Sequence, residues 1–270
     1  MISFPHAKIN IGLYITEKRS DGFHNLESCF YPIGWSDILE VIPSENTHLQ
    51  ITGLEVDGNP AENLCIKAFN LLAKDFQIPN TSIFLHKVIP MGAGLGGGSA
   101  DAAFTIKLLN QVYQIGLNDA QMQNYARLLG SDCAFFIESK PLYCYEKGDV
   151  FKNTTLNLKG KYLVLVYPHI HISTKEAYAG VSPQPLHFDL KSFLETYPLN
   201  TWKDVIKNDF ETHLFEKYSK LKEIKEQLYQ QGAFYASMSG SGSTIYGIFE
   251  KKPSKLEFDK TYTIWQETLK

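Results

Sequence analysis

The chain has 270 residues, of which 44% are hydrophobic and 20% charged, and its formal net charge is −3. This composition excludes a disordered chain and allows one large domain or two modest ones. No strongly basic field exists to attract nucleic acid or an anionic membrane surface. We therefore expect neither as a partner, and any phosphate binding must come from a local site for a small molecule.

The cysteines and the amino terminus indicate where the protein works. Cys29, Cys65, Cys133 and Cys144 are widely spaced and form neither a CxxC pair nor a metal-ligand pattern. We expect them to be reduced and buried, as free cysteines usually are. The first residues lack the basic and apolar regions of a signal peptide, and no apolar run approaches the roughly 20 residues that cross a bilayer. We expect a cytoplasmic location.

The first half of the chain mixes predicted strands and helices. Apolar segments of strand length are expected as strands at 8–16, 37–42, 49–54 and 82–88. Helical spacing of apolar residues predicts helices over 63–76, about 101–113, and 119–129. Ser99 is expected to cap the second helix with Asp101 in its first turn, and Gly130 to follow the end of the third.

The second half begins beyond a polar stretch at 151–161, which predicts domains 1–155 and 156–270. Further strands are expected at 162–167, 233–238 and 244–249, and helices at 189–196 and 214–231. A loop of small residues, Ser239-Gly240-Ser241-Gly242-Ser243, joins the last two strands.

The strongest chemical signal is the run Pro90-Met91-Gly92-Ala93-Gly94-Leu95-Gly96-Gly97-Gly98-Ser99, between a predicted strand and a predicted helix. Glycines let backbone N–H groups approach an anion, and the following helix adds its free N–H groups and the positive end of its dipole. This pattern predicts a phosphate-binding loop. A turn without a ligand is the alternative, although such a turn needs only one or two glycines.

Two known phosphate-binding motifs do not fit this run. Gly92, Gly94 and Gly97 match the dinucleotide fingerprint, but the segment after the helix is polar and helical instead of the second strand that the fingerprint requires. The Walker A motif requires a lysine before Ser or Thr, and no lysine lies between Lys87 and Lys107.

With its neighbours, the run resembles the ATP-binding motif of the GHMP kinases, the family of galactokinase and of homoserine, mevalonate and phosphomevalonate kinases. The resemblance continues, in the family's order, at 7–13, 19–24, 130–136 and 238–243. It implies an α+β fold with a ribosomal protein S5 domain 2-like N-terminal domain, a ferredoxin-like C-terminal domain and an active site in the cleft between them. ATP is the implied cosubstrate, and Mg²⁺ is expected to arrive with ATP without a protein metal site. A monomer or weak dimer is expected.

The segments Ala7-Lys8-Ile9-Asn10 and Arg19-Ser20-Asp21-Gly22-Phe23-His24 narrow the resemblance. They are most similar to the family members that phosphorylate the 2-hydroxyl of 4-(cytidine 5′-diphospho)-2-C-methyl-D-erythritol in the non-mevalonate isoprenoid pathway. Two alternatives stay open. One is a GHMP kinase for a non-nucleotide alcohol such as mevalonate or homoserine, and the other is a nucleotide-binding regulator without catalytic activity.

Asp132 and Lys8 are the candidate catalytic residues. From the sequence alone, Asp132 could simply cap a turn and Lys8 could be a surface lysine. The resemblance implies instead that Asp132 is the base and that Lys8 holds it ionised and stabilises charge on the phosphoryl group. Asn10 shares a strand face with Lys8 and could bind a substrate hydroxyl or orient the lysine.

Phe23, His24 and Tyr178 are the candidate cytidine residues, although a Phe-His pair after a turn also suits simple packing. The resemblance implies that Phe23 stacks on the base and His24 reads its polar edge, with Tyr178 on the opposite face. The family usually has tyrosine where Phe23 stands, so a hydroxyl is lost, and Ala100 likewise replaces a common serine. Ser239, Gly240, Ser241 and Gly242 are expected to close over phosphates, unless they form only a hairpin turn.

Overall fold

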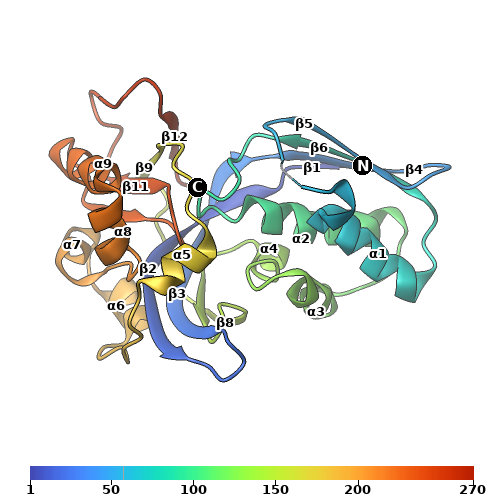
Figure 1. Cartoon of the computed structure of the whole chain (residues 1–270), viewed down its shortest axis with the longest axis horizontal. Helices are drawn as coiled ribbons and strands as arrows, with labels where there is room; N and C mark the ends of the chain where they lie inside the picture. The colour runs from blue at the N-terminus through green and yellow to red at the C-terminus, as the bar shows by residue number, and fades with distance from the viewer. Residues whose placement is uncertain (57) are drawn as a thin grey trace. The chain divides into compact units, whose positions relative to one another are not determined.

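The computed structural model describes residues 1–56 and 58–270 and shows an α+β protein (Figure 1). The chain forms two compact units that interleave along the sequence. Unit 1 comprises Met1–Lys8, Gly34–Met91 and Gly96–Lys140, and unit 2 comprises Ile9–Ile33, Gly92–Leu95 and Pro141–Lys270. These units are not contiguous in sequence, and the domains 1–155 and 156–270 stay a prediction.

Unit 1 holds a four-stranded sheet. Its strand order is β1 (Ile2–Ser3), β4 (Ile38–Pro43), β6 (Thr81–Lys87) and β5 (His48–Gly53). All neighbours are antiparallel except β5 and β6, which are parallel. Figure 1 shows the helices of this unit gathered on one side of the sheet, and α2 contacts β4 and the three other helices. The helical segments are η1 (Pro60–Glu62), α1 (Leu64–Phe76), α2 (Gly97–Val112), α3 (Asp119–Leu129) and α4 (Phe135–Glu138).

Unit 2 contains an antiparallel sheet in the order β10 (Tyr235–Met238), β11 (Ile245–Phe249), β9 (Tyr162–Tyr167) and β12 (Thr263–Thr268). Helix α9 packs against β10 and β11. Its helical segments are α5 (Thr174–Ala179), α6 (Leu190–Thr196), η2 (Leu199–Thr201), α7 (Trp202–Val205), α8 (Glu211–Lys217) and α9 (Ser219–Gln230).

A third sheet has the order β2 (His6–Lys18), β3 (His24–Ser36), β7 (Leu142–Tyr145) and β8 (Val150–Asn153). Strand β2 is buried without interruption from Ala7 to Ile15, so its polar residues Lys8 and Asn10 lie in the protein interior. The four cysteines are free and buried, which confirms the prediction for them.

Most predicted elements are present, and several match to the residue, such as α3 and β9. The predicted start of α2, at about residue 101 with Ser99 as its cap, was wrong. The helix begins at Gly97 with Gly96 as its N-cap, and Ser99 is already inside the helix. Gly96 adopts φ 73°, a conformation open to glycine, so the loop turns into the helix before Ser99. The single helix expected over 214–231 is two helices, which separate at Tyr218 with φ −124° and ψ 74°.

Some elements were missed. Strand β3 contains Pro32 and Gly34, which usually break strands, and β12 has no buried residue and no clear apolar alternation in its sequence. The short elements β7, β8 and α5 were likewise not predicted.

Candidate active site

The glycine run ends on the N-terminus of α2. Gly96 has no side chain with which to cap the helix, so the first N–H groups of α2 receive no side-chain cap. A β-carbon added at Gly96 would lie 3.0 Å from Cζ of Phe136 and 3.2 Å from Cε of Lys8. The backbone therefore comes close to a buried lysine at the position where helix N–H groups are available to bind an anion.

The earlier part of the run contacts the second small-residue loop within unit 2. Ser239 Oγ donates to the Gly94 carbonyl at 2.8 Å, and Thr244 N donates to the Ala93 carbonyl at 3.2 Å. A β-carbon on Gly94 would lie 1.9 Å from the Ser239 carbonyl oxygen. The loop at 239–243 also joins antiparallel neighbours β10 and β11, so it is a hairpin connection as well as a partner of the glycine run.

Asn208 supports this second loop and was not singled out in the sequence. Its buried side-chain amide donates to the carbonyls of Met238 and Gly240 at 2.8 and 2.9 Å, and its Oδ1 accepts from the Phe210 N–H at 3.0 Å. Asn208 lies at least 30 residues away from this loop in sequence, so local pattern carries no sign of the contact.

Lys8 and Asp132 form an ion pair within unit 1, with Nζ and Oδ2 3.4 Å apart. The Lys8 side chain is 4% exposed and that of Asp132 is 33% exposed. The alternative interpretation of Lys8 as a surface lysine is therefore wrong. Asp132 also accepts from the Phe135 N–H through its backbone carbonyl at 3.3 Å, in the turn that precedes α4. The pair combines a buried cation with a carboxylate that solvent can still reach.

Asn10 lies two residues further along β2 and is buried. Its Nδ2 donates to Ser28 Oγ at 3.0 Å, and its carbonyl accepts from Tyr246 OH at 2.7 Å. A β-carbon on Gly240 would lie 3.4 Å from Asn10 Oδ1, so this amide also packs under the second loop. These contacts fit a residue that supports the loop, and a role in substrate binding stays a prediction.

A buried charge cluster beneath the first turns of α2 was missed. Lys87 Nζ lies 2.8 Å from Asp101 Oδ2 and also contacts Asp37, and all three residues are buried. Asp37 Oδ1 further accepts from the N–H groups of Val88 and Ile89 at 2.6 and 2.8 Å. The expectation that Asp101 lies in the first turn of the helix was wrong, because α2 begins four residues earlier and turns this carboxylate inward.

The cluster has perturbed electrostatics. Burial raises the pKa of Asp101 to about 7, and the nearby Asp37 adds to this, whereas Lys87 opposes it. Burial alone would lower the pKa of Lys87, but Asp101 and Asp37 together raise it. Two carboxylates thus share one ammonium group.

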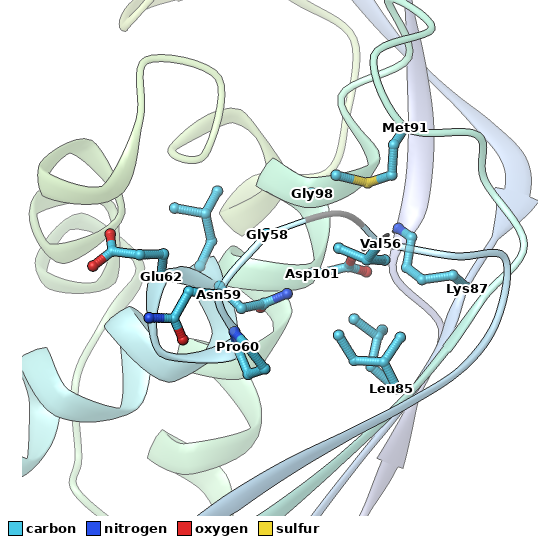
Figure 2. A pocket seen from close by; sticks show the side chains of 13 residues that line it. Val56, Gly58, Asn59, Pro60, Glu62, Leu85, Lys87, Met91, Gly98 and Asp101 are labelled. Carbon is cyan, nitrogen blue, oxygen red and sulfur yellow. Dashed lines mark hydrogen bonds and ion pairs between the residues drawn. The ribbon is translucent and has the colours of Figure 1, made fainter.

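A cavity of about 200 Å³ lies beside this cluster in unit 1 (Figure 2). Lys87 and Asp101 line it together with Met91 and Gly98 of the glycine run, and Leu85 contributes an apolar wall. The cavity places space for a ligand next to the predicted phosphate loop, with both apolar and charged lining groups.

The predicted cytidine residues lie in unit 2. His24 and Tyr178 stack on each other, with ring centroids 4.8 Å apart and an interplanar angle of 27°. Phe23 is 55% exposed, and Lys147 Nζ lies 5.3 Å from its ring centroid. Burial and the charge of Lys18 lower the pKa of His24. The structure therefore brings two of the three rings together and leaves the third open to solvent.

Within 1–56 and 58–270, no group of three or more His, Cys, Asp or Glu side chains is placed to hold a metal ion. Over the same ranges, none of the helices has the length and apolar character that a membrane span requires.

Comparison with known proteins identifies the family of this chain. The GHMP kinases N terminal domain matches residues 63–140, and the GHMP kinases C terminal domain matches residues 189–260. A 4-diphosphocytidyl-2-C-methyl-D-erythritol kinase of Cytophaga hutchinsonii is 52% identical over 94% of both chains. One of Bacteroides fragilis is 46% identical over 99% of both chains.

A crystal structure of 4-(cytidine 5′-diphospho)-2C-methyl-D-erythritol kinase superposes with a TM-score of 0.79 at 30% identity, and it covers 93% of this chain and 91% of the other. The match confirms the predicted α+β, two-domain GHMP kinase fold. At these levels of identity and coverage, the chain belongs to the 4-diphosphocytidyl-2-C-methyl-D-erythritol kinases of the GHMP kinase family.

Proposed function

We propose that this chain transfers the γ-phosphate of ATP to the 2-hydroxyl of 4-(cytidine 5′-diphospho)-2-C-methyl-D-erythritol, in the non-mevalonate route to isoprenoid precursors. The observation that carries the proposal is the ion pair of Lys8 and Asp132 beside Gly96. The names of the relatives in Cytophaga hutchinsonii and Bacteroides fragilis support the choice of substrate.

The chemistry follows from what phosphoryl transfer requires, which is positioning, charge stabilisation and a group that takes the proton of the attacking hydroxyl. The hydroxyl oxygen forms a bond to the γ-phosphorus while the bond to the bridging oxygen of ADP breaks, and the hydroxyl proton passes to Asp132. Lys8 stabilises the negative charge on the equatorial oxygens. Because Lys8 is buried, water competes weakly with the phosphoryl group for its ammonium.

Pro90 to Ser99 are proposed to bind ATP, with the phosphates at the N-terminus of α2. The cavity lined by Met91, Gly98 and Leu85 would take the nucleoside part, because it adjoins the glycine run and offers an apolar wall. Mg²⁺ would be held chiefly by the triphosphate oxygens and water, which suits its preference for oxygen ligands.

The cytosine ring is proposed to bind at His24 and Tyr178. The stacked pair offers an aromatic face, and the imidazole can form hydrogen bonds with the polar edge of the base. Phe23 supplies a further exposed ring nearby in sequence. A substrate such as mevalonate or homoserine has no base that would use these rings.

An ADP-release assay with the cytidyl substrate, mevalonate and homoserine in parallel tests the proposal. We expect turnover with the cytidyl substrate alone. Turnover of mevalonate or homoserine instead would overturn the substrate assignment. ATP binding without turnover of any of the three would favour a regulator. The cytoplasmic location and the monomeric or weakly dimeric state stay predictions.

A further inference from the structure

Helix α5 carries Tyr178 and has only six residues. A helix of this length has little stability of its own in water, because nucleation costs more than a few hydrogen bonds return. Ser173 caps its N-terminus by accepting from the Glu176 N–H at 3.2 Å, but this contact fixes only the first turn. The orientation of Tyr178 must therefore depend on what the rest of the helix packs against.

Helix α8, in the same unit, supplies the packing surface. Glu176 accepts from Lys217 Nζ at 2.6 Å and from Tyr218 OH at 2.7 Å. The Tyr178 ring meets Phe210 edge-on, with centroids 4.9 Å apart. Lys217 is 60% exposed, so its ion pair is screened and adds little rigidity.

Gly180, the C-cap of α5, packs on His213 of α8. A β-carbon at Gly180 would lie 2.1 Å from Cδ2 and 2.3 Å from Cγ of His213, far inside van der Waals contact. Both ring nitrogens of His213 are buried, and neither has a hydrogen-bond partner among the described residues. The imidazole therefore serves here as a flat packing surface, and only glycine fits against it.

We propose that Gly180 and His213 are positioning residues for the nucleobase of the acceptor substrate. By seating the end of α5 on α8, they hold Tyr178 against His24 and so determine the affinity for the cytidine moiety. This inference rests on the proposed function, because it takes Tyr178 as part of the base-binding site. Neither residue contacts the reacting groups, so both act on binding of the acceptor and not on phosphoryl transfer.

The test is Gly180→Ala, alone and combined with His213→Ala. In the single variant the new methyl group must displace His213 or α5. We expect KM for the cytidyl substrate to rise about tenfold or more, because loss of one stacking contact between a base and an aromatic ring weakens binding by a factor of this order. Both kcat and KM for ATP should stay within about threefold. In the double variant the truncated side chain at position 213 makes room for the methyl group, and KM for the cytidyl substrate should return most of the way to the wild-type value.

Lys175→Ala on α5 and Thr212→Ala on α8 are matched controls, because both side chains are exposed on the same two helices. Both should leave KM unchanged. Calorimetric titration with cytidine diphosphate provides a readout independent of turnover, and its Kd should follow KM across the series. If Gly180→Ala does not fold, a double variant that folds and binds cytidine diphosphate normally supports the argument that the new methyl group clashes with His213.

An unchanged KM in Gly180→Ala would overturn the inference, and so would a double variant as impaired as the single one. A loss confined to kcat would also contradict it. Measurements on the wild-type protein distinguish failure of this inference from failure of the proposed function. If the wild type neither binds cytidine diphosphate nor turns over the cytidyl substrate, the proposed function itself is wrong.

Discussion

Replacement of Lys8 by methionine tests the catalytic assignment most directly. Methionine keeps a flexible apolar stem of similar length in a site where the side chain is 4% exposed, but it removes the ammonium group 3.4 Å from Asp132. We expect kcat to fall by about 10²–10³, the usual effect of removing one group that stabilises transition-state charge. KM for either substrate should change much less if Lys8 acts mainly in the transition state.

The fold should tolerate this change. Asp132 is one-third exposed, so water can solvate its carboxylate once the lysine is gone, and the cost in unfolding free energy should be about 1 kcal/mol. Thermal unfolding of Lys8→Met beside Lys140→Met separates the two effects. Lys140 is an exposed lysine ion-paired to Glu138, and its replacement should affect neither stability nor kcat.

A double-mutant cycle gives the decisive result. Asp132→Asn removes the proton acceptor and should lower kcat by about 10²–10⁴. If Lys8 and Asp132 act as one unit, the double variant should be no slower than the slower single variant by more than a few-fold, because such effects do not add. A Lys8→Met enzyme with an intact fold and kcat within a few-fold of the parent would refute the assignment.

Three further predictions follow from buried groups. Burial raises the pKa of Asp101 to about 7, so its protonated form stabilises the folded state. This contribution is fully present below about pH 4 and is lost as the pH rises to 7. Over this range, urea unfolding should show the stability of the wild type falling relative to that of Asp101→Asn by at most about 4 kcal/mol. Gly94→Ala should lower the melting temperature and raise KM for ATP, because its β-carbon would lie 1.9 Å from the Ser239 carbonyl; an unchanged KM would contradict the assigned loop contact. Asn208→Ala removes the amide that donates to the buried carbonyls of Met238 and Gly240, and the Met238 carbonyl keeps only a long contact from Ser237 Oγ at 3.4 Å. The variant should cost about 1–3 kcal/mol in chemical unfolding, and a cost of less than about 1 kcal/mol would show that water replaces the amide.

The sequence was informative wherever the spacing of residues within a segment determines its secondary structure. The apolar spacing of residues 119–129 and the apolar run 162–167 predicted α3 and β9 to the residue, because each pattern is fixed by the period of its own element. The burial of Lys8 was weakly visible as a lysine within an apolar strand. The proposal that Lys8 is catalytic rests on the family resemblance and not on the periodicity.

Contacts between distant segments could not be predicted. Asp37 is 50 residues from Lys87, and Asp101 is 14 residues from it, so nothing local marks them as one cluster. The sequence shows only that Asp37 and Lys87 are charged residues at the ends of apolar strands and that Asp101 lies within a helix of small residues. Asn208 is a polar residue in a loop with no pattern at all. Such groups become visible only when the fold brings their partners within hydrogen-bond distance.

Different physical reasons account for the individual glycines of the proposed phosphate-binding loop. Gly94 and Gly96 have positive φ and face the Ser239 carbonyl and the Lys8 side chain, and Gly97 lies 3.0 Å from Ile89 at its β-carbon position, so packing within the protein accounts for all three. Gly98 is different: a β-carbon there would find nothing closer than Cε of Met91 at 3.8 Å, and its backbone is helical. The fold leaves room for a side chain at Gly98, which lines the cavity, so packing within the protein does not account for this glycine, whereas the proposed close approach of ATP to its backbone would.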